Sequence, residues 1–320
     1  MEPSYLALHS SGELTRRAKV ARDRLSACDL CPRECGLDRT QGELGYCDTG
    51  RLARVASFDL HWGEEDPLVG QGGSGTIFFS HCNLGCVFCQ NWDISRGPQH
   101  GGEQGIEVAP NQLAWMMLEL QRRGAENINL VSPSHVAAQI LEALILAVAD
   151  GLTLPLVWNT GGYDSPRTLA LLDGVVDIYM PDTKFHDPDI AKRFCNAPDY
   201  PERARAAIAT MHAQVGDLTL DDNGVATRGL LVRHLVMPDD LAGTAHWMRF
   251  LAGLSKNTYV NIMGQYRPCG QAHVFPELAR AVTASEVKKA KEIARDAGLT
   301  RLDRRKGGIV RFLMQKSPSR

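Results

Sequence analysis

The sequence predicts an α/β fold, a partial (β/α)6 barrel of parallel strands, preceded by a small N-terminal cysteine metal-binding module. After residue 75, six apolar, β-rich segments alternate with segments whose apolar residues recur at helical spacing. Strands separated by helical crossovers form a parallel sheet with right-handed connections. A doubly wound sheet would use the same connections and stays open as the alternative. Four cysteines within twenty residues precede this series and mark the module.

Composition and cysteine clustering divide the chain into four parts. We expect the four-cysteine module in residues 1–56, a glycine-rich connector in 57–75, the barrel in 76–270, and a C-terminal helical extension with a basic tail in 271–320. The connector contains GQGGSG, which looks like a phosphate-binding loop. Because it precedes a strand and lacks a following Gly-Lys-Ser/Thr, we interpret it as a turn.

The six expected strands run into loops that carry polar residues. The strand segments are 76–82, 128–135, 154–164, 175–185, 229–239 and 258–268, and helices are expected at 109–125, 136–152, 165–174, 202–216, 242–255 and 283–298. In a parallel sheet the carboxyl ends of all strands meet at one edge, where α/β proteins place their chemistry. We therefore expect a shared pocket at that edge.

Composition and charge argue against several classes of protein. The 320-residue chain has 44% apolar and 22% charged residues, so it can bury a substantial core, and its net charge of −2 gives no reason to expect nucleic acid or an anionic membrane as a partner. Its longest apolar run, residues 143–149, is far too short to span a bilayer. No secretory signal is visible at the N-terminus, so we expect a cytoplasmic protein.

Three cysteines lie in one loop after the first expected strand. Cys82, Cys86 and Cys89 could hold three irons of a [4Fe–4S] cluster and leave the fourth iron open for another ligand. An open position distinguishes a catalytic metal site from a closed structural one. A zinc site would need His81 as its fourth ligand, but residues 81 and 82 point to opposite sides of an extended strand.

The spacing C-x3-C-x2-C, with Phe88 before the last cysteine, resembles the radical S-adenosylmethionine (SAM) superfamily. The motif follows the first strand of a β/α series, as in that superfamily, and the resemblance covers roughly residues 72–268. The segments SGTIFFSHCNLGCVFCQNW, DIYMPDTKF, VRHLVMP and VNIMGQYRP are most similar to the pyruvate formate-lyase activating enzyme family, in its branch with an extra N-terminal cysteine module.

The resemblance implies a radical enzyme with a [4Fe–4S] cluster and SAM as cofactors. One electron from a reductant such as flavodoxin or ferredoxin would release a 5′-deoxyadenosyl radical, which abstracts a hydrogen atom. The target could be a glycine in a glycyl radical enzyme, another protein or peptide, or a small molecule. The alternative from a different class is a non-catalytic electron-transfer or interaction protein, with iron–sulfur or zinc at its cysteines.

The resemblance also implies roles for residues at the strand ends. Phe88 would pack beside the adenine, and Asn159, which stands where the family has Asp, would face the ribose. In PDTK the carboxylate of Asp182 would accept hydrogen bonds from the ribose hydroxyls. Lys184 and His234 would donate to the methionine carboxylate.

The segment VSPSH departs from the family, which has Gly-Gly-Glu after the second strand to bind the SAM amino group. Ser132, Ser134 or backbone carbonyls would take that role here. A structural alternative for Ser134 is the N-cap of the following helix.

A second set of four cysteines lies upstream with the spacing C-x2-C-x3-C-x11-C: Cys28, Cys31, Cys35 and Cys47. Four thiolates close a metal's coordination shell, so the set predicts a second metal centre, and zinc and a second iron–sulfur cluster both stay open. The centre could fold the N-terminal segment, relay electrons or present a partner. We interpret the remaining Cys195 and Cys269 as ordinary semi-buried thiols.

Overall fold

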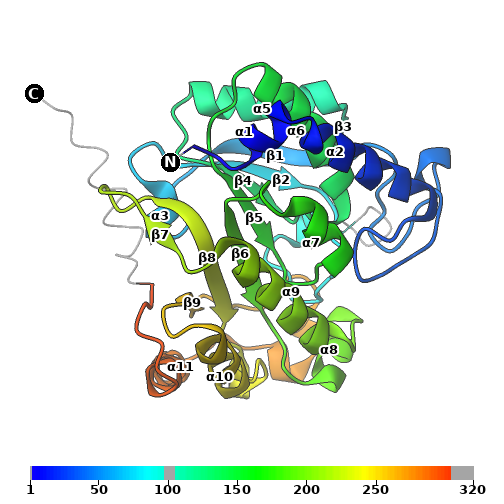
Figure 1. Cartoon of the computed structure of the whole chain (residues 1–320). Helices are drawn as coiled ribbons and strands as arrows, with labels where there is room; N and C mark the ends of the chain where they lie inside the picture. The colour runs from blue at the N-terminus through cyan, green and yellow to red at the C-terminus, as the bar shows by residue number, and fades with distance from the viewer. Residues whose placement is uncertain (1, 97–104, 304–320) are drawn as a thin grey trace, which may run out of the picture.

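The computed structural model describes residues 2–96 and 105–303 of the chain. At its centre is a curved sheet in which six strands run parallel to their neighbours, as the sequence predicts (Figure 1). In order across the sheet they are β2 (Ser74–Phe79), β4 (Ile128–Val131), β5 (Leu156–Thr160), β6 (Ile178–Thr183), β8 (Ala226–Leu235) and β9 (Tyr259–Met263). Beyond β9 only an isolated bridge joins Val260 to Leu302, so the described strands do not close into a barrel.

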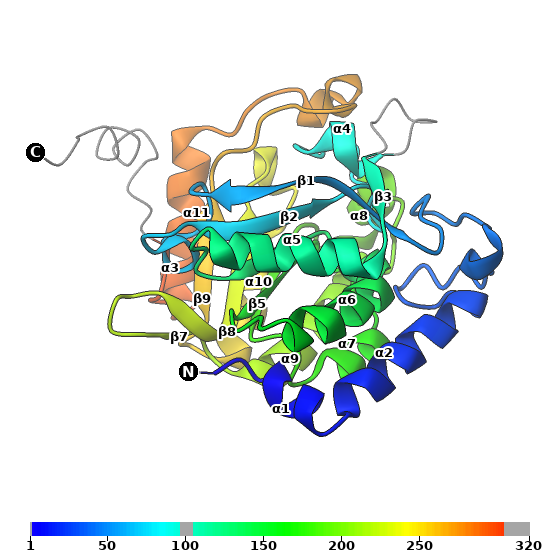
Figure 2. The same cartoon turned by 90° about the horizontal axis from the view of Figure 1, so that it is seen from above.

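Helices lie along the outer side of the curved sheet (Figures 1 and 2). The helices between and after the parallel strands are α5 (Pro110–Arg122), α6 (Ala137–Ala149), α7 (Pro166–Leu172), α8 (Pro188–Cys195), α9 (Tyr200–Val215), α10 (Thr244–Leu254) and α11 (Ala284–Asp296). None of the helices in the described ranges is long and apolar enough to cross a membrane. The expected basic tail, from residue 304 onward, lies outside the described residues.

Three further strands were not predicted from the sequence. β1 (Ala53–His61) pairs antiparallel with β2, β3 (Ile106–Val108) pairs antiparallel with β1, and β7 (Thr219–Leu220) forms a hairpin with β8. The register of β1 shifts between Val55 and Ser57. Such a bulge interrupts the two-residue alternation by which a half-buried strand is recognised, which explains why β1 was missed.

The N-terminal helices share the hydrophobic core of the barrel. α1 (Tyr5–Ser10) and α2 (Glu13–Asp23) pack against α6. Tyr5 and Leu25 belong to the same buried apolar cluster as the barrel helices, and the Tyr5 hydroxyl donates to the Leu154 carbonyl at 2.7 Å. The segment before the four cysteines therefore draws its stability from contacts with the barrel.

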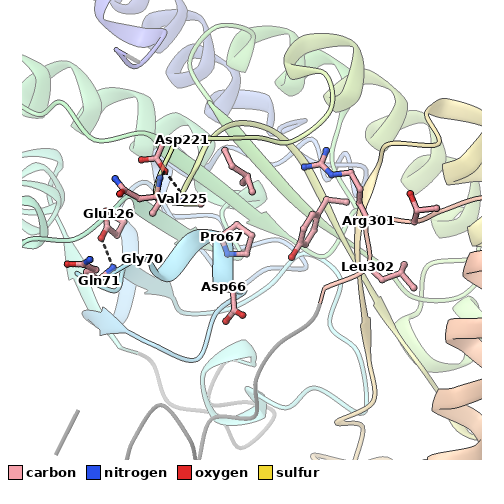
Figure 3. A pocket seen from close by; sticks show the side chains of 14 residues that line it. Asp66, Pro67, Gly70, Gln71, Glu126, Asp221, Val225, Arg301 and Leu302 are labelled. Atoms are coloured by element: carbon pink, nitrogen blue, oxygen red, sulfur yellow. Dashed lines mark hydrogen bonds between the residues drawn. The ribbon is translucent and has the colours of Figure 1, made fainter. Parts of the chain in front are cut away.

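The glycine-rich segment GQGGSG forms a turn between α3 (Asp66–Val69) and β2, as predicted. The Glu126 carboxylate accepts a hydrogen bond from the amide of Gln71 at 2.8 Å (Figure 3) and another from the amide of Gly72 at 2.9 Å. A side chain of the protein thus occupies the amides that a phosphate-binding loop would offer to a ligand. The pocket of about 810 Å³ beside this turn lies at the amino ends of the strands and contains none of the cysteines.

Gly72 lies too close to a neighbouring segment to carry a side chain, since a Cβ atom there would lie 1.8 Å from the Gly124 carbonyl oxygen. We expect Gly72→Ala to lower the free energy of unfolding by about 1–3 kcal/mol, because the backbone must shift. Urea denaturation measures this change. In the control Gly253→Ala, nothing lies within 4 Å of the new Cβ, so stability should stay equal or rise by up to about 1 kcal/mol. Equal stability of Gly72→Ala and the wild type would contradict this contact.

Candidate functional site

The carboxyl ends of the parallel strands surround a cavity of about 200 Å³. The sequence-predicted residues that line it are Cys82, Cys86, Phe88, Cys89, Ser132, Asn159, Asp182 and Lys184. They come from the loop after β2 and from the ends of β4, β5 and β6. The three-cysteine loop and the polar strand ends therefore face one common space, as expected for a parallel sheet.

The three-cysteine loop turns sharply after β2. Gly85 has a φ of 67°, and a Cβ atom there would lie 2.8 Å from the Tyr46 hydroxyl, so a larger residue would not fit without displacement. Within the loop, the Leu84 amide donates a hydrogen bond to the Cys82 sulfur at 3.4 Å. This hydrogen bond lowers the pKa of Cys82, but burial outweighs it and the pKa is raised overall.

His81 does not join the three cysteines. Its imidazole is buried, with Nδ1 3.4 Å from Thr49 Oγ1, and lines a separate pocket beside the N-terminal segment. Burial lowers the pKa of this imidazole. The geometry therefore gives no support to a zinc site with His81 as the fourth ligand.

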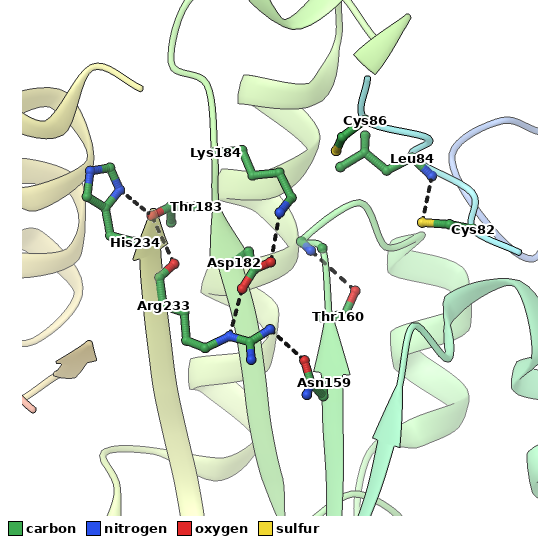
Figure 4. A network of polar contacts seen from close by, with 12 residues as sticks. Cys82, Leu84, Cys86, Asn159, Thr160, Asp182, Thr183, Lys184, Arg233 and His234 are labelled. Atoms are coloured by element: carbon green, nitrogen blue, oxygen red, sulfur yellow. Dashed lines mark hydrogen bonds and ion pairs between the residues drawn. The ribbon is translucent and has the colours of Figure 1, made fainter. Parts of the chain in front are cut away.

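Asp182 is the centre of a charged network that joins β5, β6 and β8 (Figure 4). Lys184 Nζ lies 2.8 Å from Asp182 Oδ2, and Arg233 Nε lies 2.7 Å from Oδ1. Arg233 Nη2 also donates to Asn159 Oδ1 at 2.6 Å. Burial alone would raise the pKa of Asp182, but the positive charges of Arg233 and Lys184 outweigh it and lower that pKa. The carboxylate in turn raises the pKa of Lys184 against the effect of burial, so both groups are charged at neutral pH.

Arg233 lines the cavity, whereas its neighbour His234, the residue expected to contact SAM, lies outside the lining. Successive strand residues point to opposite faces, which separates the two side chains. His234 is fully buried, with Nδ1 2.9 Å from Thr183 Oγ1 and Nε2 3.0 Å from Thr244 Oγ1. Burial lowers the pKa of His234 to about 4, so the ring is neutral and both nitrogens have partners. This packing argues against the expected contact with SAM.

The two serines of VSPSH also separate. Ser132, whose φ is 58°, lines the cavity, and its amide donates to the Asn159 carbonyl at 2.9 Å. Ser134 is buried outside the lining, and its hydroxyl donates to Asp164 Oδ1 at 2.7 Å. Ser134 does not cap the following helix either, because no side chain forms a capping hydrogen bond at the N-terminus of α6. Only Ser132 of this pair is placed to face a ligand.

Phe88 forms an apolar wall of the cavity. Its ring is almost completely buried and packs edge-to-face against Phe185 and Tyr266, with centroid separations of 5.4 and 6.1 Å. These contacts hold the ring in one orientation. A fixed aromatic wall suits a flat ring such as adenine, which is the role that the sequence resemblance implies.

Cys195 is a residue of the site that sequence reasoning missed. It lies at the end of α8, fully buried, and its thiol donates to the Cys86 sulfur at 3.3 Å. This hydrogen bond lowers the pKa of Cys86, whereas burial raises the pKa of Cys195. Cys86 is therefore the more acidic thiol of the pair. The two residues are 109 positions apart, so no local pattern could have indicated the contact.

The four upstream cysteines line a second, enclosed cavity: Cys28, Cys31, Cys35 and Cys47. Burial, together with the neighbouring cysteines, raises the pKa of Cys31 and of Cys47. In the described parts of the chain, no three Cys, His, Asp or Glu side chains are arranged to hold a metal ion. This finding covers Cys82, Cys86 and Cys89 as well, so the side-chain arrangement by itself shows neither cysteine set as a metal site, and the second metal centre stays a prediction.

The buried His234 should make stability depend on pH. Its pKa of about 4 in the folded protein lies below the value of about 6.5 in an unfolded chain, so the unfolded state binds the proton first as pH falls. Between pH 7.0 and 5.5, the wild type should lose about 1 kcal/mol more unfolding free energy than His234→Gln. Urea denaturation at each pH measures this. The control His273→Gln, which removes an exposed imidazole, should keep the wild-type slope. Equal slopes for wild type and His234→Gln would refute the assignment.

Comparison with known proteins agrees with this geometry. Residues 76–221, which contain the three-cysteine loop, Asn159, Asp182 and Lys184, match the family model of the radical SAM superfamily. Over 290 residues the chain is 32% identical to an uncharacterized protein of Methanocaldococcus jannaschii, an alignment that covers 88% of this chain and 78% of that relative. The chain belongs to the radical SAM superfamily.

Proposed function

We propose that this protein holds a [4Fe–4S] cluster at Cys82, Cys86 and Cys89 and uses SAM to generate a radical for hydrogen-atom abstraction. The observation that carries the proposal is the single cavity in which these thiols face Asp182 and Lys184. Members of the superfamily cleave SAM to a radical, and the cavity supplies thiol ligands and charged groups within one small volume.

The donor set suits an iron–sulfur cluster with one open position. Cysteine thiolates are the usual ligands of such clusters, and three thiols leave one iron free. The hydrogen bond from Cys195 lowers the pKa of Cys86, whereas burial outweighs the Leu84 amide and raises the pKa of Cys82, as it does that of Cys89, so binding of iron would have to displace those two thiol protons. Bound here, the cluster would supply the electron that cleaves SAM into methionine and a 5′-deoxyadenosyl radical.

The polar residues of the cavity can position SAM around that cluster. Lys184 Nζ carries three N–H donors, of which one goes to Asp182, and the others can bind the methionine carboxylate. Asp182 can accept from the ribose hydroxyls, since each carboxylate oxygen has more than one lone pair. Asn159 Oδ1 already accepts from Arg233, so the group it can offer to the ribose is its amide nitrogen, a donor.

The lining of the cavity supports a different choice of basic residue from the one that the sequence suggests. His234 is neutral and has partners at both nitrogens, so we assign it to packing between β6, β8 and α10. Arg233 replaces it at the cavity, where it holds Asp182 and Asn159 in fixed positions. Ser132 stands at the edge where other members carry Gly-Gly-Glu, so we assign the SAM amino group to Ser132 and nearby backbone carbonyls.

For the target of the radical, we favour a glycine in a partner enzyme, because the sequence resembles the pyruvate formate-lyase activating enzymes. A peptide or a small molecule is the alternative, and the fold does not select among them. Flavodoxin or ferredoxin would be the reductant. A partner protein labelled with α-deuterated glycine should transfer deuterium into 5′-deoxyadenosine, detected by mass spectrometry. Deuterium transfer from a labelled small molecule instead would reject the glycyl target.

The central test is SAM cleavage. After anaerobic reconstitution with iron and sulfide, the protein should be brown and should form 5′-deoxyadenosine when SAM and a strong reductant are added. The Cys89→Ala variant should lose this activity, whereas Cys269→Ala should keep it, because Cys269 does not line the cavity. A colourless reconstituted protein without SAM cleavage would favour the non-catalytic alternative.

Asp182→Asn should weaken SAM binding. The substitution removes the charge that Lys184 and Arg233 share; it leaves Lys184 without this ion pair, while Arg233 keeps Glu64, whose Oε2 lies 3.9 Å from its Nη1. We expect the dissociation constant for SAM to rise at least about tenfold, which corresponds to about 1.4 kcal/mol. Anaerobic equilibrium dialysis of the reconstituted protein measures this. Asp189→Asn, on the exposed start of α8, is the matched control and should bind SAM like the wild type. Unchanged affinity in Asp182→Asn would remove this residue from the proposed site.

Cys195→Ala should change the reduction potential of the cluster while leaving its iron content intact. Hydrogen bonds to cluster sulfurs stabilise the reduced, more negative state, so losing the Cys195 donor should lower the midpoint potential. Redox titration followed by electron paramagnetic resonance measures the shift, and Cys195→Ser should restore most of it because a hydroxyl also donates. Equal potentials in all three proteins would show that this contact does not tune the cluster.

A further inference from the structure

The four-cysteine segment folds into a compact loop around its enclosed cavity. The Cys28 amide donates to the Leu37 carbonyl, and the Gly36 amide donates back to the Cys28 carbonyl, both at 2.9 Å. Between them, Glu34 and Gly36 have positive φ angles of 43° and 66°, which reverse the chain. Gly45 packs closely against this loop, since a Cβ atom there would lie 2.9 Å from the Cys35 sulfur. The backbone thus holds the thiols around one buried space.

Arg39 is buried against these cysteines, with 2% of its surface exposed. Its Nη1 lies 3.6 Å from the Cys28 sulfur and donates to the His135 carbonyl at 2.8 Å. Its Nε and Nη2 donate to the Gly50 carbonyl at 3.1 and 2.9 Å. Within the described residues, its hydrogen-bond partners are thus carbonyl oxygens and a thiol, and none is a carboxylate.

A guanidinium is always charged, so the buried Arg39 needs a negative partner. Burying a charge without one costs several kcal/mol, and carbonyl oxygens offset only part of that cost. Neutral thiols bring no charge to this cavity. Four thiolates around a zinc ion, or around a [4Fe–4S] cluster in its oxidised state, carry a net charge of about −2.

We propose that Cys28, Cys31, Cys35 and Cys47 hold an anionic metal–thiolate centre and that Arg39 is its buried counter-cation. Zinc and an iron–sulfur cluster share the chemistry that the site needs, namely four thiolate ligands and a net negative charge. The proposal does not depend on SAM cleavage by the downstream cysteines.

The position of Arg33, between Cys31 and Cys35, gives this centre a consequence for the downstream site. Arg33 Nε donates to the Asn83 carbonyl at 2.8 Å, and its Nη2 donates to the Leu84 carbonyl at 3.1 Å and to the Cys195 carbonyl at 3.0 Å. Its guanidinium also stacks on the ring of Tyr46, 3.7 Å from the centroid. A single side chain of the four-cysteine loop therefore ties the three-cysteine loop to the end of α8.

This geometry makes Arg33 a positioning residue. A metal at the upstream cysteines would fix the backbone on both sides of Arg33, and Arg33 would in turn fix the loop that carries Cys82 and Cys86. Loss of the upstream metal should then loosen the downstream loop, although none of the upstream cysteines lines the SAM cavity.

The first experiment separates the two cysteine sets by metal analysis. A triple variant, Cys82→Ala, Cys86→Ala and Cys89→Ala, is purified anaerobically, reconstituted and analysed for zinc, iron and sulfide. We expect about one zinc, or about four irons with matching sulfide, per chain. A folded triple variant with neither would overturn the proposal. If this variant does not fold, the wild type decides: about four irons plus one zinc, or about eight irons, supports the centre, and four irons without zinc overturns it.

The second experiment tests Arg39. A chelator is added to the reconstituted protein, and the rate of metal loss from the upstream site is followed in Arg39→Gln, Arg39→Lys and wild type. We expect Arg39→Gln to lose metal at least tenfold faster, because an amide cannot balance the thiolate charge, and Arg39→Lys to stay close to wild type. Arg16→Gln is the matched control, because it removes the charge of an exposed arginine side chain. Equal rates in Arg39→Gln and wild type would overturn the counter-cation role.

The same proteins separate this inference from the proposed function. The triple variant has no downstream cluster ligands, so its metal content reports on the upstream site alone. A wild-type protein that fails to cleave SAM but holds the upstream metal would contradict only the proposed function. Full SAM cleavage by a protein without upstream metal would contradict only the further inference.

Discussion

The common direction of six strands is the constraint on which the candidate site depends. Because β2, β4, β5, β6, β8 and β9 run parallel, their carboxyl ends meet at one edge. Cys82, Asp182 and Arg233 are far apart in the sequence, and the shared direction of their strands brings them to one cavity. The crossover helices take the outer side of the sheet, so this edge stays free for chemistry. One reversed strand would send its polar end to the opposite side of the molecule.

Buried charged side chains lie beside both cysteine sets, but their partners differ. At the downstream site, the carboxylate of Asp182 lies between Lys184 and Arg233, and Glu64 lies 3.9 Å from Arg233, so the protein provides carboxylates for both cations. At the upstream site, the hydrogen bonds of Arg39 within the described residues go to carbonyl oxygens and a thiol. The first network lines the cavity with donors and acceptors in a fixed arrangement. For the second, we propose that a bound metal converts the four thiols to thiolates and so supplies the negative charge that Arg39 lacks.

The contacts between the two sites show why they are best considered together. Arg33 reaches from the four-cysteine loop to the backbone of the three-cysteine loop, and Cys195 reaches the Cys86 sulfur from the end of α8. The downstream thiols are thus held from two sides by residues that have no place in the cysteine motif itself. A loop that must present three sulfurs at fixed positions gains its rigidity from such contacts. The N-terminal helices add to this arrangement by packing into the core of the barrel.

The sequence by itself determined the six parallel strands, the edge at which their polar residues gather, and the division of seven cysteines into sets of three and four. These features are periodic or closely spaced, so they can be recognised within short windows of sequence. Only the tertiary structure decided which of two neighbouring residues faces the cavity, Arg233 rather than His234, and Ser132 rather than Ser134. It also decided that Cys195 meets Cys86 and that Arg39 is buried beside the upstream thiols. The physical reason is that these contacts depend on the twist of each strand end and on pairings between distant segments, which no local pattern encodes.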